Sequence, residues 1–190
     1  MNELLEFAKI NHVPIMQKDG IEFLEQYIKD NNISNVLEIG TAIAYSAIRM
    51  CLASPNVKVT TIERNDIMYN EAIKNIKKFN LEDRITVIHG DALEVDVYGS
   101  YDLIFIDAAK SQYIKFFDKY TKYLNKDGVV ISDNLNFHGL RKDYMNIESK
   151  NLRSMMKKLN DYIEFLKDNK EFHTEFLEIG DGIGITKRSN

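Results

Sequence analysis

The stretch Asn35-Val36-Leu37-Glu38-Ile39-Gly40-Thr41-Ala42-Ile43-Ala44-Tyr45-Ser46 joins a short apolar run to a glycine and then to a second apolar segment. The run at 35–39 has the length and composition of a buried strand, and Gly40 permits a sharp turn after it. Similar runs recur along the chain, separated by segments of helical period. This alternation predicts βα units in a parallel sheet that helices cover on both faces. The expected strands are Asn35–Ile39, Val57–Ile62, Ile85–His89, Leu103–Ile106 and Val129–Ser132.

The two ends of the chain add to this plan. Phe172–Ile179 and Ile183–Lys187 flank Gly180-Asp181-Gly182, which is the pattern of a β-hairpin. The fold class that we predict is α/β: a doubly wound, mostly parallel sheet that ends in an antiparallel hairpin, with extra N-terminal helices. The expected helices include Leu4–Ala8, Gly20–Ile28, Asn70–Phe79 and Asn151–Lys167, where apolar residues recur at helical spacing.

Length and composition limit the class of protein. A chain of 190 residues suits one domain, which we expect to span residues 1–190. The single cysteine, Cys51, cannot form an internal disulfide, and no apolar run approaches the length of a membrane span. The N-terminus is acidic and amphipathic, unlike a secretory signal. We therefore expect a cytoplasmic protein without a membrane partner.

The net charge of −4 argues against nucleic acid as a partner, but the charge is unevenly distributed. Residues 138–170 contain eight Lys or Arg against five Asp or Glu. Such a segment can dock a polyanion, and it can equally be a solvated helix face.

Polar residues at the ends of three successive strands predict a nucleoside site. Gly40 follows the first strand, Glu63 follows the second, and Asp91 follows the third. Glu63 can accept hydrogen bonds from both hydroxyls of a ribose, and Asp91 can accept one from an adenine amino group. Each of these residues could instead be a cap or turn residue. Only the first glycine of the G-x-G-x-x-G dinucleotide fingerprint is present, which favours S-adenosylmethionine over NAD and makes an NAD-dependent oxidoreductase a poor alternative.

Two carboxylates and an amide oxygen follow the fourth and fifth strands. If these strands are neighbours, Asp107, Asp133 and Asn134 converge at the carboxyl edge of the sheet, where they suit a hard cation such as Mg²⁺. The alternative is that both aspartates only cap the helices that follow. Lys110 lies three residues beyond Asp107 and can act as the general base for a substrate hydroxyl. The alternative for Lys110 is a surface lysine at a helix start.

Together these residues resemble the caffeoyl-CoA and catechol family of metal-dependent O-methyltransferases, which have a Rossmann-like fold. The patterns that carry the resemblance are E-I-G-T-x-x-G-Y-S, F-I-D-A-x-K-x-x-Y and S-D-N, beginning at residues 38, 105 and 132. One departure is Ala44, where the family usually has glycine, and we expect modestly weaker cofactor binding from it. The resemblance implies metal ligands at Asp107, Asp133 and Asn134 and a catalytic base at Lys110. The expected cofactor-binding residues are Met16, Glu38, Gly40, Ser46, Glu63, Arg64, Asp91, Ala92 and Asp107.

Within that family the chain is most similar to bacterial tRNA 5-hydroxyuridine methyltransferases, over Ala109–Tyr113 with Phe116-Phe117, and over Asp133–Gly139. This similarity implies the tRNA anticodon loop as substrate, 5-methoxyuridine as product, and a homodimer. The expected substrate-binding residues are His138 for the base and Arg141, Lys142, Lys150 and Arg153 for phosphates. Two alternatives stay open: a methyltransferase that acts on catechols or related phenols, and a nucleotide-binding module without catalysis.

Overall fold

The computed structural model describes residues 1–136 and 144–189. Its seven strands are β1 (Asn35–Ile39), β2 (Lys58–Glu63), β3 (Ile85–His89), β4 (Tyr101–Ile106), β5 (Leu124–Ser132), β6 (Phe172–Leu177) and β7 (Ile183–Arg188). The α-helices are α1 (Asn2–Ile10), α2 (Lys18–Asp30), α3 (Tyr45–Ala53), α4 (Asp66–Lys78), α5 (Tyr113–Tyr120) and α6 (Lys150–Asp168). Three short 3₁₀ helices are η1 (Lys110–Gln112), η2 (Thr121–Tyr123) and η3 (Tyr144–Asn146).

The strands form one sheet in the order β3-β2-β1-β4-β5-β7-β6. The first five of these are parallel, whereas β7 runs antiparallel to both β5 and β6. The chain leaves β1 toward one edge of the sheet and returns at β4 to proceed toward the other edge. The crevice between the ends of β1 and β4 is therefore the topological switch point, where ligands bind in sheets of this kind.

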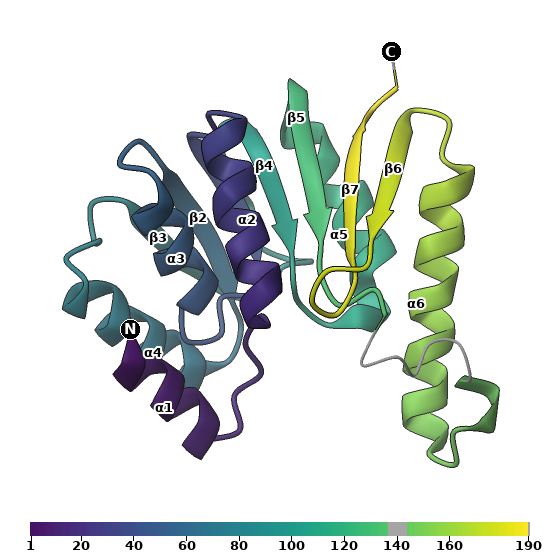
Figure 1. Ribbon diagram of the computed structural model, residues 1–190, viewed down its shortest axis with the longest axis horizontal. Coiled ribbons are helices and arrows are strands. Elements are labelled where there is room, and N and C mark those ends of the chain that lie inside the picture. The colour runs from purple at the N-terminus through teal and green to yellow at the C-terminus, as the bar shows by residue number, and fades with distance from the viewer. Residues whose placement is uncertain (137–143, 190) are drawn as a thin grey trace.

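Two apolar layers enclose the sheet, because successive side chains of each strand point to opposite faces. Val36 packs with α1 to α4 on one face, whereas Leu37 packs with α5 and α6 on the other. Figure 1 shows α2 and α3 in front of the sheet and α5 behind it. Burial of the sheet on both faces explains the continuous apolar runs of β1 and β4, which occupy its centre.

The predicted α/β class, the mostly parallel sheet and the closing antiparallel hairpin are confirmed. Two boundaries differ in an informative way. Helix α4 begins four residues earlier than predicted, because the Asn65 side chain accepts hydrogen bonds from the amides of Ile67 and Met68 as an N-cap. Strand β5 begins at Leu124, ahead of the polar residues 125–127, because Leu124 is buried and pairs with Tyr101 across an irregularity in the ladder.

The single cysteine, Cys51, is a structural residue of the core. Its side chain is buried on α3, and burial raises the pKa of its thiol to about 11, so that it remains protonated. Among the described helices, none combines the length with the hydropathy that a membrane crossing requires.

Candidate active site

A cavity of about 590 Å³ opens at the carboxyl ends of the five parallel strands. The segment Pro14–Gln17, which precedes α2, forms part of its wall. A volume of this size falls within the range for small-molecule sites. The cavity brings together ten of the residues predicted from the sequence: Met16, Gly40, Ser46, Glu63, Arg64, Asp91, Ala92, Asp107, Lys110 and Asn134.

The other predicted residues lie elsewhere. Glu38 and Asp133 are not among the residues that line the cavity, and both are buried behind its wall. Lys150 and Arg153 occupy the first turn of α6, where Lys150 is exposed and Arg153 is partly buried. His138, Arg141 and Lys142 lie outside the described residues.

Only glycine fits at position 40, because the backbone there lies directly against the backbone of Asp107. The φ of Gly40 is +102°, and a Cβ at this position would lie 2.2 Å from the carbonyl oxygen of Asp107. No side chain fits there, so the end of β1 can lie directly against the end of β4. The glycine thereby brings the β1 loop beside the predicted metal ligand.

Glu63 and Asp91 both accept hydrogen bonds within turns and can still accept further hydrogen bonds from a ligand. Glu63 accepts hydrogen bonds from the amides of Ala42 and Asn65, each at 2.8 Å, one on each carboxylate oxygen. Asp91 Oδ1 accepts from the amide of Leu93 at 2.8 Å, and Arg64 lies 3.6 Å from Asp91 Oδ2. A carboxylate has about four acceptor positions, so both groups, which line the cavity, retain acceptor capacity for a ligand. The turn and ligand interpretations are therefore compatible.

Glu38 is fully buried below the β1 loop. Ser46 Oγ donates to its Oε1, and Thr61 Oγ1 donates to its Oε2 at 2.6 Å. Thr41 Oγ1 lies 2.6 Å from Thr61 Oγ1 and continues the chain of hydroxyls. Burial outweighs these hydrogen bonds and raises the pKa of Glu38 to about 8. Glu38 thus supports the loop from below and is placed to act on a ligand only through Ser46.

The β1 loop is held in an unusual backbone conformation. Ala42 has a φ of +45° and Ala44 a φ of +64°, both in the left-handed region that non-glycine residues seldom adopt. Ala44 precedes α3, and its position explains the glycine that the related pattern has there. Its amide donates to Thr41 O at 2.8 Å, so the tight turn is hydrogen-bonded despite the strain.

Asp107, Asp133 and Lys110 form a charged cluster at the end of β4 and β5. Lys110 Nζ lies 3.1 Å from Asp107 Oδ1, and its side chain is only 13% exposed, so it is not a solvated surface lysine. Asp133 is 1% exposed. Its burial, followed by the nearby charge of Asp107, raises its pKa to about 7.

The donor set at this cluster fits a divalent cation. Asn134 Nδ2 donates to Asp133 Oδ2 at 3.0 Å, which leaves the amide oxygen of Asn134 as an acceptor beside the cavity. A cation would relieve the repulsion between the two carboxylates that raises the pKa of Asp133. In the described part of the chain no group of three or more His, Cys, Asp or Glu side chains is arranged to hold a metal. The amide oxygen and water would therefore have to complete the coordination.

The capping interpretation of the two aspartates is not supported. Helix η1 begins after Ala109 and α5 after Gln112, and neither start has a side-chain cap. After Asp133, the first described helix is η3, which begins at Tyr144.

Several residues of the site were missed by the sequence analysis. Tyr45, Gln17, Gln112 and Phe116 line the cavity, and Thr61 supports Glu38. Two signals were available: Tyr45 stands beside Ser46 in the quoted pattern, and Thr61 is a polar residue inside an otherwise apolar strand.

Known proteins share this architecture and sequence. The sequence profile of the family described as O-methyltransferase matches residues 1–189. A candidate caffeoyl-CoA O-methyltransferase from Staphylococcus aureus is 42% identical, covers 99% of this chain and 91% of its own, and superposes with a TM-score of 0.94. An O-methyltransferase from Bacillus cereus, solved in complex with SAH (S-adenosylhomocysteine), is 25% identical with a TM-score of 0.84 and covers 99% of this chain and 90% of its own. The caffeoyl-CoA O-methyltransferase of Medicago sativa is 29% identical over 205 residues, which cover 99% of this chain and 81% of the relative.

The left-handed conformation of Ala44 yields a stability prediction. Ala44→Gly removes a strain of about 1–2 kcal/mol, whereas Ala47→Gly, at an equally buried but ordinary helical position of α3, costs about 1 kcal/mol. The free energies of unfolding of the two variants, measured by urea denaturation, should therefore differ by about 2–3 kcal/mol in favour of Ala44→Gly. Equal losses in both variants would show that Ala44 is unstrained.

The raised pKa of Glu38 yields a prediction of pH dependence. Its folded-state pKa of about 8 lies above its ordinary value of 4.5, so the folded state holds a proton that the unfolded state releases between these values. The contribution of Glu38 to stability is thus complete below pH 4.5 and is lost as pH rises to about 8, with a slope of at most about 1.4 kcal/mol per pH unit. In urea denaturation from pH 5 to 9, Glu38→Gln should lose less stability than the wild type. Glu82→Gln, on the exposed surface, should follow the wild type; parallel curves for all three proteins would contradict the prediction.

Proposed function

Because the chain belongs to the O-methyltransferase family, we propose that it methylates 5-hydroxyuridine at the wobble position of tRNA with the help of a divalent cation such as Mg²⁺. It is an S-adenosylmethionine-dependent O-methyltransferase of the caffeoyl-CoA type. The observation that carries the cation-assisted transfer is the cluster of Asp107, Asp133 and Lys110 at one end of the cofactor-sized cavity. The tRNA substrate rests on the resemblance and on the basic residues of α6. The homodimer implied by the resemblance stays a prediction.

The sheet order dictates how the cofactor would lie in the cavity. Asp91 stands after β3 and would accept from the adenine amino group, and Glu63 stands after β2 and would accept from the ribose hydroxyls. The amino-acid part then lies over β1, beside Tyr45 and Ser46. The sulfonium methyl is thereby directed toward β4, where Asp107 and Lys110 are.

The reaction needs an acceptor oxygen close to that methyl. Lys110 would take the proton of the acceptor hydroxyl as the neutral amine, and its largely enclosed Nζ stands beside Asp107 at the end of β4. The oxygen then attacks the methyl carbon as the carbon–sulfur bond breaks, and S-adenosylhomocysteine leaves. Asp107, Asp133 and Asn134 would hold the cation, which as a Lewis acid favours the oxyanion form of the acceptor. Both O5 and O4 of 5-hydroxyuridine can reach one cation, as the two oxygens of a catechol can.

Two basic residues of α6 support a nucleic-acid substrate. Lys150 and Arg153 lie in the first turn of this helix, which follows Asn134 in the sequence by 16 residues. An anticodon loop can present an unstacked base to a cavity while cationic side chains hold its phosphates. His138, Arg141 and Lys142 belong to the same proposal but lie outside the described residues.

The direct test is methyl transfer from labelled S-adenosylmethionine to two acceptors, tRNA containing 5-hydroxyuridine and a simple catechol, with Mg²⁺ and with EDTA. Label should enter the tRNA, disappear with EDTA and be absent from tRNA without the 5-hydroxyl. Asp133→Asn should lose most of the transfer, because removal of one charge weakens the cation site. Label in the catechol alone would assign the protein to small-molecule methylation, and transfer that is insensitive to EDTA would exclude the cation.

A second prediction concerns the basic turn of α6. Replacing both Lys150 and Arg153 with Gln should weaken tRNA binding and reduce the slope of log K against log salt by about 1–2, one unit for each phosphate that is no longer neutralised. Lys126→Gln with Lys58→Gln, two exposed lysines on β5 and β2, serves as the matched control. Filter binding at about 50–200 mM salt measures both quantities, and identical slopes for the two double variants would remove α6 from the interface.

A further inference from the structure

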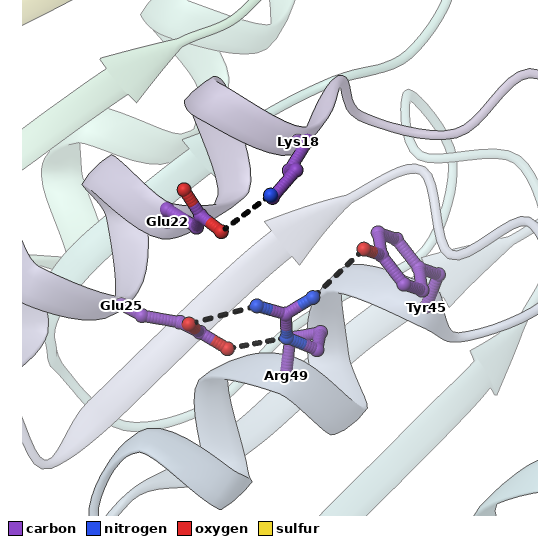
Figure 2. Close-up of polar contacts among 5 residues, drawn as sticks. All are labelled: Lys18, Glu22, Glu25, Tyr45 and Arg49. Carbon is purple, nitrogen blue, oxygen red and sulfur yellow. Dashed lines mark hydrogen bonds and ion pairs between the residues drawn. The ribbon is translucent and has the colours of Figure 1, made fainter. Parts of the chain in front are cut away.

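An ion pair with little solvent exposure joins α2 to α3 beside the cavity. Arg49 of α3 donates to both carboxylate oxygens of Glu25 of α2, through Nε and, at 2.9 Å, through Nη2. The two side chains are only 19% and 18% exposed. Figure 2 shows the guanidinium between Glu25 on one side and Tyr45 on the other. A bidentate pair of this kind fixes both direction and distance between its helices.

The same guanidinium holds Tyr45. Arg49 Nη1 donates to the Tyr45 hydroxyl at 2.9 Å, and the guanidinium carbon lies 5.6 Å from the centre of the Tyr45 ring. Tyr45 is 5% exposed and lines the cavity as the first residue of α3. Arg49 itself is not among the lining residues, so it can influence a ligand only through its neighbours.

Glu25 connects the pair, through α2, to the 14–17 segment that forms part of the cavity wall. Met16 and Gln17 line the cavity, and Gln17 is the N-cap residue of α2, whose carbonyl accepts from Ile21 at 3.0 Å. Gly20 lies against Met16, because a Cβ at Gly20 would meet Met16 Cε at 3.0 Å. A shift of α2 relative to α3 would thus displace the 14–17 segment relative to Tyr45, and these two form the walls of the cavity above β1.

We propose that the Glu25–Arg49 pair is a positioning device for the cofactor, which fixes Tyr45 and the 14–17 segment around the amino-acid part of S-adenosylmethionine. The proposal rests on the cofactor orientation given above, in which that part lies over β1. The neighbouring Ser46 hydroxyl already donates its hydrogen bond to Glu38 and is not free to donate one to the cofactor. The packing and placement of Tyr45 therefore contribute more to cofactor binding at this end of the cavity.

Figure 2 also provides a matched control. Lys18 and Glu22 form a pair on the same helix, at 3.7 Å, but their side chains are 82% and 54% exposed. Glu22→Gln therefore removes an ion pair of α2 that touches neither α3 nor Tyr45 in the described hydrogen bonds and ion pairs. An exposed pair of this kind contributes little to stability.

The test is calorimetric titration of Arg49→Lys, Glu25→Gln and Glu22→Gln with two probes, at a temperature well below the unfolding midpoint of each variant. S-adenosylhomocysteine contains the amino-acid part, and 5′-methylthioadenosine shares the nucleoside but lacks that part. Arg49→Lys and Glu25→Gln should weaken S-adenosylhomocysteine binding about tenfold, the effect of roughly one charge-assisted hydrogen bond. They should leave 5′-methylthioadenosine affinity unchanged and raise KM for S-adenosylmethionine more than they lower kcat. Glu22→Gln should bind both probes as the wild type does.

A double variant tests whether Arg49 acts through Tyr45. Tyr45→Phe with Arg49→Lys should weaken S-adenosylhomocysteine binding no more than Arg49→Lys alone, because coupled residues are not additive. Lower thermal midpoints without any change in affinity, or equal losses for both probes, would overturn the proposal and leave the pair as a contact that only stabilises the fold. A wild type that binds neither probe would instead contradict the use of this cavity for the cofactor.

Discussion

Four main-chain hydrogen bonds continue the parallel ladder one residue beyond the strand ends. The amide of Gly40 donates to Ile62 O, that of Gly90 to Glu63 O, that of Asp107 to Ile39 O, and that of Asp133 to Ile106 O, all at 2.9–3.1 Å. The register of the ladder thus fixes where every loop of the site begins. The close approach of Gly40 to the Asp107 carbonyl depends on this register, as does the proximity of Asp133 to Asp107. A slip of one residue in any strand would turn these side chains to the opposite face of the sheet.

Two buried carboxyl groups beside this ladder, those of Glu38 and Asp133, compensate for desolvation in different ways. Glu38 is enclosed by the hydroxyls of Ser46 and Thr61, with no cation among its described partners, and its raised pKa favours the neutral form. Asp133 is similarly buried, but the charges around it are those of Asp107, Lys110 and Asp181. A neutral Glu38 is a satisfied structural group, whereas Asp133 becomes stable as an anion only when a positive charge is near. The same carboxyl chemistry therefore gives a neutral structural group under the β1 loop and, after β5, a carboxyl group whose ionisation depends on the charges beside it.

The sequence was sufficient for the fold and for ten of the 23 residues that line the cavity, because both follow from where the parallel strands end. Apolar runs located the five parallel strands, and polar residues after them, such as Glu63 and Asp91, necessarily meet at one sheet edge. Whether a residue lines that cavity depends instead on how deeply its side chain is buried and on which way the side chain points, and neither can be read from strand ends. Glu38, which we expected to bind the cofactor, points under the loop, and Tyr45, which we did not single out, forms part of the wall. The Glu25–Arg49 pair joins residues that are 24 positions apart, and no local pattern indicates it.

Three of the six described non-glycine residues with a left-handed backbone stand at the cavity, whereas His12, Asn32 and Asn80 follow the ends of helices. Ala42 at +45° and Asn134 at +60° line the cavity in the left-handed region, and Ala44 at +64° lies directly under the start of α3. Such conformations cost free energy and persist only where the surroundings determine them fully. Here the surroundings are specific: Ala42 donates to Glu63, Ala44 donates to Thr41 O, and Asn134 donates to Asp133. The loops are thus held in place before any ligand arrives, which reduces the ordering cost of binding. A site that must align a methyl group with an oxygen gains from that rigidity, since the rate of an in-line displacement depends on the positions of the reacting atoms.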